Sequence, residues 1–219
     1  DKLEFTIASR YHEANAYQDN VQGMVSVEHR VVHADHRYRT LLDSADAQNV
    51  NPQTIVGACA ELGGFFETAR QVVVCGKTAV SRLSLSDEAG RYSGEFLLHP
   101  GIMDGVFVTA IALARHSGVI IDTQIIVPIY IGRLSAYQTI TRKNYTAEVR
   151  IIDATADIIR FDAVLLDEDD NVVLTLSDLS EKIVVKKDID GRFEALTSRA
   201  ARTHAGKIQL KSTSAQDRG

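Results

Sequence analysis

Residues 99–114 read HPGIMDGVFVTAIALA, and this stretch decides the fold. Nearly every residue from Gly101 onward is apolar or small, which is typical of a helix inside a protein core. We expect a buried helix over residues 101–115 that ends near Gly118, because glycine favours the C-terminus of a helix. Asp104 is the exception, since no lysine or arginine lies close to it in the sequence.

Two interpretations of Asp104 follow from this pattern. An acid in the first turn of a helix is stabilised by the exposed N–H groups and the helix dipole. However, Asp104 precedes Phe107, Val108 and Ile111 by 3, 4 and 7 residues, which places it on one face with core residues. Desolvation there raises the pKa of a carboxyl group. A carboxyl group that keeps its proton near neutral pH is suited to act as a general acid.

The segments around this helix are rich in strand patterns. Two short strands are expected within residues 71–86, with a turn at Gly76 and Lys77, and another within 93–99 after a turn at 87–92. Four β-branched stretches follow the helix, at 123–138, 144–155, 156–170 and 171–185, with a hairpin turn at 167–171. One buried helix beside a long run of antiparallel strands predicts an α+β fold, with the sheet wrapped round the helix.

We divide the chain into four parts. Alternating patterns predict a hairpin in residues 1–32, the end of a preceding half-domain. Residues 33–53 are polar and are interpreted as a linker. The helix and its sheet form a domain at 54–187, and the basic residues 188–219 form a tail or linker.

The distribution of charge excludes some functions. Of 24 lysines and arginines, 9 lie in residues 182–219, and of 29 acids, 4 lie there. That segment carries about +5 and residues 1–181 about −10, so the body is a poor binder of nucleic acid. No apolar run approaches the ~20 residues that span a bilayer, so no membrane association is expected.

The cysteines and histidines indicate a cytoplasmic protein without a metal. Cys59 and Cys75 form no CxxC pair, and we expect both to be reduced core residues. His29, His33 and His36 are spaced by 4 and 3 residues, but no further ligand lies nearby. A zinc site needs three or four convergent ligands, so no metal site is predicted.

Three stretches together resemble the dehydratase domains of polyketide synthases. Residues 98–110, LHPGIMDGVFVTA, resemble the family's His-Pro-x-x-x-Asp segment, which is followed by a helix. Residues 61–85 resemble its Tyr-Gly-Pro-x-Phe element and the strands after it. Residues 125–134, IIVPIYIGRL, resemble its Leu-Pro-Phe strand. The order and approximate spacing agree over roughly residues 50–187.

This resemblance implies a double hot-dog fold, in which each half wraps an antiparallel sheet round one long helix. On this basis we identify residues 54–187 as the second, C-terminal half, with the first half degenerate or missing. The implied activity is that of a hydro-lyase: water is removed from a 3-hydroxyacyl thioester on an acyl carrier protein, giving an enoyl thioester. The substrate arrives on the carrier's phosphopantetheine arm, without another cofactor. The implied partners are the carrier protein, other polyketide synthase domains and a second copy in a homodimer.

The resemblance also implies roles for single residues. Asp104 matches the aspartic acid that protonates the departing hydroxyl group, while a histidine from the first half abstracts the α proton. The residues expected to line the acyl channel are His99, Pro100, Val108, Leu62, Gly63, Phe66, Pro128 and Tyr130.

The chain departs from the family pattern at three places. No histidine fits the first half's His-x-x-x-Gly-x-x-x-x-Pro motif. Val108 stands where the family carries Gln or His, and Leu62 and Gly64 replace the tyrosine and proline of Tyr-Gly-Pro-x-Phe. Two other functions therefore stay open beside dehydration. One is a dehydratase-like isomerase or cyclase, and the other is an inactive dehydratase-like domain that serves as an interaction element.

Overall fold

The computed structural model describes residues 2–11, 16–26, 41, 44–52, 54, 64–185 and 209–212. The chain divides into two compact units, one formed by residues 1–30 with 190–219 and the other by residues 31–189.

The smaller unit contains a three-stranded antiparallel sheet in the order β10-β1-β2. Its hairpin consists of β1 (Lys2–Tyr11) and β2 (Ala16–Ser26). The third strand, β10 (Gln209–Ser212), pairs with β1, although the sequence analysis assigned this segment to a tail or linker. Pairing satisfies N–H and C=O groups that a two-stranded hairpin leaves open on that edge.

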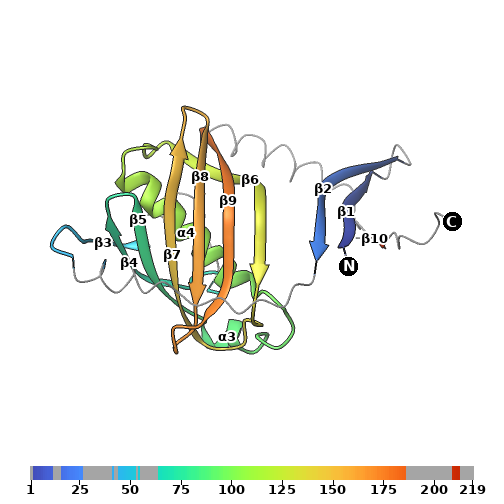
Figure 1. The fold of residues 1–219 in the computed structure, drawn as a ribbon, viewed down its shortest axis with the longest axis horizontal. Coiled ribbons are helices and arrows are strands. Elements are labelled where there is room, and N and C mark those ends of the chain that lie inside the picture. The colour runs from blue at the N-terminus through green and yellow to red at the C-terminus, as the bar shows by residue number, and fades with distance from the viewer. Residues whose placement is uncertain are drawn as a thin grey trace. The chain divides into compact units, whose positions relative to one another are not determined.

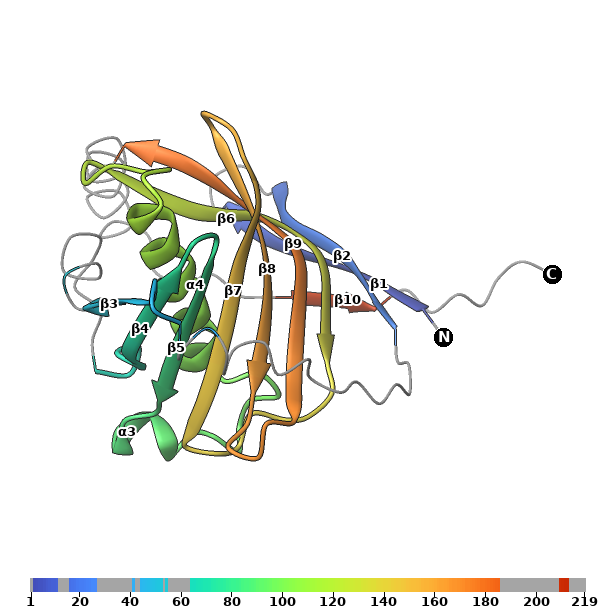
Figure 2. The ribbon, with the colours of Figure 1, turned by 60° about the vertical axis from the view of Figure 1, so that its left-hand side comes forward.

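The larger unit is a seven-stranded antiparallel sheet with one long helix, α4 (Pro100–His116) (Figure 1). Figure 2 shows α4 lying along one face of the curved sheet. The fold is therefore of the α+β, hot-dog-like kind. In spatial order, its strands are β3 (Gln48–Val50), β4 (Ala69–Cys75), β5 (Thr78–Ser84), β7 (Asn144–Ala154), β8 (Ile158–Leu166), β9 (Val172–Val185) and β6 (Gln124–Ala136).

Two segments differ from the expected elements. β3 lies within the predicted linker, where Val50 pairs with Val72 of β4. Residues 93–99 form turns and bends instead of a strand. They follow a short helix, α3 (Asp87–Gly90), and the Ser93 and Glu95 N–H groups donate to the Gly90 and Tyr92 carbonyls. Ser86 caps α3 by accepting a hydrogen bond from the Ala89 N–H group. The chain therefore reaches α4 through turns.

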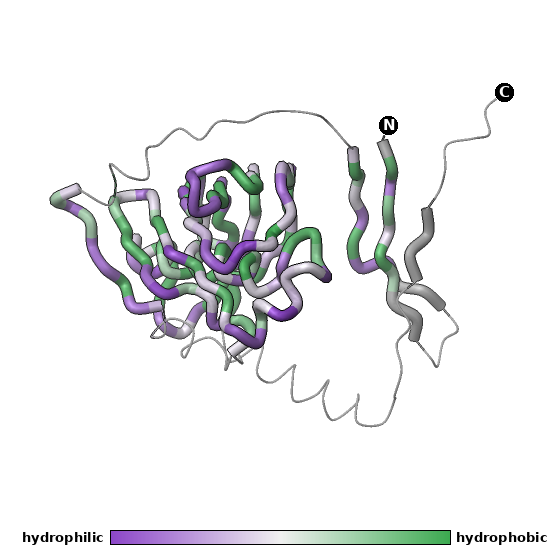
Figure 3. The backbone as a smooth tube through the Cα atoms, turned by 90° about the horizontal axis from the view of Figure 1, so that it is seen from below, coloured by the Kyte–Doolittle hydropathy of each residue, from purple (hydrophilic) through white to green (hydrophobic). Residues whose placement is uncertain are grey.

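The core lies between α4 and the strands β4, β5 and β7. Hydrophobic and hydrophilic residues alternate along much of the sheet, as Figure 3 shows. Cys75 is a free, half-buried cysteine, whereas Cys59 lies outside the described residues. Among the described helices, none is long and apolar enough to cross a membrane. The largest fully buried side chains include Phe161, Leu83, Leu85, Ile102, Leu113, Ile140, Ile159 and Leu179.

Two glycines let α4 approach the neighbouring strands closely. A Cβ atom at Gly105 would lie 2.5 Å from Thr68 Oγ1 and 2.9 Å from Leu83 Cδ2. A Cβ atom at Gly101 would lie 2.6 Å from the Phe65 carbonyl oxygen. The Thr68 hydroxyl donates a hydrogen bond of 2.8 Å to the Gly101 carbonyl. The N-terminal half of α4 is therefore fixed against the sheet by close contact and by a buried hydrogen bond.

Replacement of Gly105 by alanine should destabilise the fold by about 1–3 kcal/mol, because the methyl group would overpack this contact. Gly90→Ala is the matched control, since a Cβ atom there meets nothing within 4 Å. That control should be neutral or stabilising by up to about 1 kcal/mol. Urea unfolding of both variants measures the difference. Equal stability of the two would contradict the close approach of α4 to β5.

Candidate active site

His99 holds the start of α4. Its Nδ1 accepts a 3.1 Å hydrogen bond from the Gly101 N–H group, as the N-cap of the helix. Because Nδ1 accepts, the proton is assigned to Nε2, which donates to the Ala89 carbonyl oxygen at 3.0 Å. The ring is fully buried and stacks on Phe65 at a centroid distance of 5.1 Å. Both ring nitrogens are occupied, so His99 has none left to abstract a proton from a substrate.

Asp104 lies beyond the first turn of α4, which contains no acidic residue. Capping of this helix is done by His99, so it does not account for the acid. The carboxyl group is half-buried, and its Oδ2 atom is buried without a hydrogen-bond partner among the described residues. This burial raises the pKa of Asp104 to about 6. The group therefore holds its proton far closer to neutral pH than an ordinary aspartic acid does.

The surroundings of Asp104 on α4 are apolar. Phe107 and Ile111, on the same face, are half-buried and pack against the main core. Val108, one turn after the acid, is only 4 % exposed and has no polar atom in its side chain. Nothing in this turn of the helix orients the carboxyl group by a side-chain hydrogen bond.

Three of the predicted channel residues lie at the Asp104 end of α4: His99, Pro100 and Phe66. Pro100 occupies the first turn beside His99. Phe66 is 36 % exposed, and its ring contacts the Phe65 ring edge-on at 5.1 Å. Leu62 and Gly63 lie outside the described residues.

Pro128 and Tyr130 lie elsewhere, on the edge strand β6. Pro128 pairs with Glu181 of β9, which in turn pairs with Ile159. Gly105, next to Asp104, lies beside Leu83 of β5. Leu83 pairs with Tyr145 of β7, whose neighbour Thr146 pairs with Leu166 of β8, so Asp104 lies near the Leu166 end of β8. From Leu166 to Ile159 the strand advances by seven residues, or ~23 Å.

Tyr130 pairs with Ser180, so its side chain shares the outer face of the sheet with Arg160, away from α4. The structure thus brings His99, Pro100 and Phe66 to the end of α4 that carries Asp104. It does not bring Pro128 and Tyr130 there.

Glu181 is a second buried acid, and it was not predicted from the sequence. Glu181 is 1 % exposed, and its Oε1 atom has no hydrogen-bond partner in the part of the chain that the structure describes. Desolvation raises its pKa to about 8. It faces inward because of a bulge at Asp178, whose φ is 56°. The bulge shifts the alternation of β9 by one residue, so no periodic pattern in the sequence could reveal this burial.

The comparisons with known proteins assign the family. Residues 40–188 match the family described as the polyketide synthase dehydratase N-terminal domain. The chain belongs to this family. Identification of residues 54–187 as the C-terminal half is therefore wrong. Both halves of a double hot-dog are built as a sheet round one helix, so short stretches at a helix start did not distinguish them.

Solved dehydratase domains share the fold of this polyketide synthase dehydratase-like chain. The domain from the CurJ module of curacin polyketide synthase is 12% identical with a TM-score of 0.70, covering 85% of this chain and 76% of that chain. The dehydratase domain of RzxB from Pseudomonas fluorescens is 19% identical, with a TM-score of 0.65 and coverages of 82% and 75%. A trans-AT polyketide synthase dehydratase domain from Brevibacillus brevis is 16% identical with a TM-score of 0.72, covering 84% of this chain and 65% of that chain. No curated protein sequence matches the chain.

Glu181 should make the stability of the domain depend on pH. Its pKa in the folded state, about 8, lies above the ordinary value of 4.5. Between these values the unfolded chain releases the proton and the folded chain keeps it, so stability falls as the pH rises. The loss of stability is on the order of 5 kcal/mol, at about 1.4 kcal/mol per pH unit.

Glu181→Gln should remove this dependence, which urea unfolding at pH 4.5, 6 and 8.5 measures as the difference from the unmodified protein. Glu95→Gln, at an exposed site, controls for the loss of one negative charge. An unchanged slope in Glu181→Gln would show that the carboxyl group finds a partner in solution.

Proposed function

We propose that this dehydratase-like domain catalyses the removal of water from a 3-hydroxyacyl thioester, with Asp104 as the general acid. The observation that supports the proposal is the half-buried Asp104 carboxyl group, with a pKa of about 6 and one oxygen unpartnered among the described residues. A hydroxyl group of the substrate would supply the missing partner. Family membership supports the same class of reaction.

The elimination needs an acid because hydroxide is a poor leaving group. A base takes the α proton, and the electron pair of the broken C–H bond forms the new carbon–carbon double bond. The bond to the 3-hydroxyl group breaks as this double bond forms. Asp104 gives its proton to the departing oxygen, so that water and an enoyl thioester leave and a carboxylate remains. The proton taken by the base restores the acid through solvent. No oxidation occurs, so the reaction consumes no redox cofactor.

The base lies outside the described residues or on another chain. The described histidines are His99 and His116. His99 uses both ring nitrogens within the fold, and His116 is exposed at the end of α4, ~18 Å along the helix axis from Asp104. We therefore expect that a base other than these two histidines completes the site. We also propose that the thioester is presented by an acyl carrier protein.

Asp104→Asn should strongly slow dehydration while leaving the fold intact. The full chain, unmodified or with Asp104→Asn, is incubated with a 3-hydroxyacyl thioester on a carrier protein. Mass spectrometry follows the loss of water. We expect kcat/KM to fall by about 10²–10⁴-fold in the variant. Because the acid must be protonated, activity of the unmodified protein should decrease as the pH rises through about 6.

Asp153→Asn, at an exposed site, is the control and should leave the rate unchanged. Water loss that persists undiminished in Asp104→Asn would overturn the role of Asp104. No water loss with the unmodified protein would overturn dehydration. With an enoyl thioester as substrate, a product of unchanged mass that NMR shows to have a shifted double bond or a new ring would instead support the isomerase or cyclase.

A further inference from the structure

A hollow of about 330 Å³ lies between α3 with its following turn and the segment 141–143 that leads into β7. Three cations and three hydroxyl groups line it, against one carboxylate, that of Asp87. The two carboxylates that contact Arg142, those of Asp167 and Asp169, are not part of this lining. The cationic and hydroxyl residues are Arg91, Arg142, Lys143, Ser86, Ser93 and Thr141.

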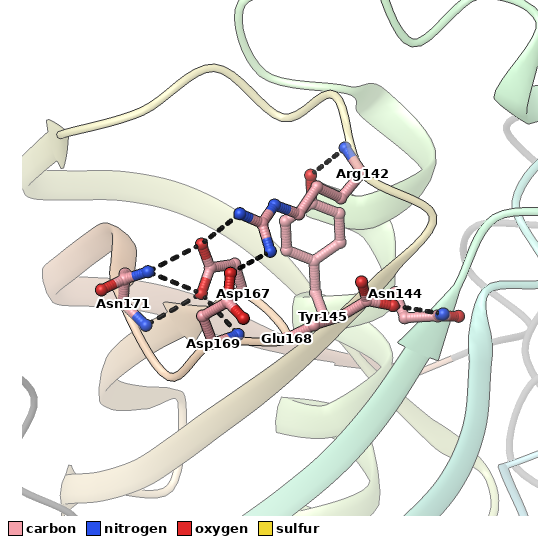
Figure 4. Close-up of polar contacts among 7 residues, drawn as sticks. All are labelled: Arg142, Asn144, Tyr145, Asp167, Glu168, Asp169 and Asn171. Atoms are coloured by element: carbon pink, nitrogen blue, oxygen red, sulfur yellow. Dashed lines mark hydrogen bonds and ion pairs between the residues drawn. The ribbon is translucent and has the colours of Figure 1, made fainter.

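Arg142 is held in place by a partly buried polar cluster, drawn in Figure 4. Its Nη1 atom lies 2.6 Å from Asp169 Oδ2 and its Nη2 atom 3.6 Å from Asp167 Oδ2. Asp167 is 2 % exposed and accepts hydrogen bonds from the backbone N–H groups of Asp169 and Asn171. The backbone N–H of Arg142 donates to the Tyr145 hydroxyl at 2.7 Å. These contacts orient the guanidinium group, which has five N–H donors, before any ligand arrives.

The other two cations, Lys143 and Arg91, can contact a ligand without the loss of a strong interaction. Lys143 Nζ lies 2.8 Å from Asp87 Oδ1, but the Asp87 side chain is 91% exposed, and such a pair contributes little to stability. Arg91 is exposed and forms no ion pair with another described residue. The Leu85 N–H group donates to the Lys143 carbonyl at 2.9 Å, which ties the two walls of the hollow together.

We propose that this hollow binds a phosphate group. A fixed guanidinium, an ammonium and a second guanidinium around a small hollow suit a compact dianion with several acceptor oxygens. The Ser86 hydroxyl accepts from the Ala89 N–H, so its own hydrogen is available to a ligand oxygen. The phosphate comes from free phosphate or from an ester such as pantetheine 4′-phosphate. The second source rests on the proposed function.

The position of the hollow favours the ester. Ala89 of α3, beside the lining residue Gly90, accepts the hydrogen bond from His99 that caps α4. The hollow and Asp104 are therefore at the same end of the larger unit. A carrier arm whose phosphate is held here would bring its acyl chain to the side of the molecule where the acid lies.

Calorimetric titration of the full chain with inorganic phosphate and with pantetheine 4′-phosphate tests the proposal. Lys143→Ala should weaken binding of both by about fivefold, which is the worth of one exposed charge interaction. Arg91→Ala combined with Lys143→Ala should abolish measurable binding. Asp87→Asn should tighten binding, because it removes the carboxylate that competes for Lys143.

Arg150→Ala is the matched control, since Arg150 also forms an exposed ion pair, at 3.4 Å from Asp162, on another part of the sheet. Equal weakening by Arg150→Ala and Lys143→Ala would overturn the proposal, as would the absence of heat with both ligands. Tighter binding of the ester than of free phosphate would assign the site to the carrier arm, and equal binding would assign it to free phosphate. The measurement needs no turnover, so it stands or fails separately from the role of Asp104.

Discussion

The close approach of α4 to β5, made possible by the missing side chain at Gly105, positions the rest of the larger unit. A Cβ atom there would meet Thr68 and Leu83 at less than 3.0 Å, so Gly105 must face the sheet. Successive helical residues are turned by about 100°. The Asp104 side chain therefore lies about 100° round the helix from the face that meets β5. The same contact that packs the core also determines where the acid lies.

The buried acids of this domain differ in how they are satisfied. Asp167 is buried, but hydrogen bonds from Asn171 and Asp169 and the Arg142 guanidinium surround it, so it has a structural explanation. Asp104 and Glu181 each have a buried oxygen without a partner among the described residues, and burial raises both pKa values. Such groups cost stability when they ionise. For Asp104, the proposed proton transfer explains why a destabilising buried acid is present. For Glu181, we infer only that stability depends on pH.

Local patterns predicted the fold well, and features set by the tertiary structure escaped prediction. The helix expected at 101–115 spans Pro100–His116, and the four β-branched stretches after it are β6, β7, β8 and β9. Periodicity is a local property, which is why these elements could be read from the sequence. The inward face of Glu181 depends on one bulge at Asp178, and the role of His99 depends on Ala89 ten residues earlier. The assignment to the wrong half failed for a similar reason, since the halves share one architecture.

His99 connects the two functional proposals physically. Its Nδ1 atom accepts from the Gly101 N–H group at the start of α4, the helix that carries Asp104. Its Nε2 atom donates to Ala89 of α3, which forms one wall of the hollow. The ring is fixed between these elements by its stacking on Phe65 and its edge contact with Phe96. A histidine used in this way keeps its proton on Nε2 and cannot act as the base without releasing one of the two elements. The proposed elimination therefore needs a base other than His99.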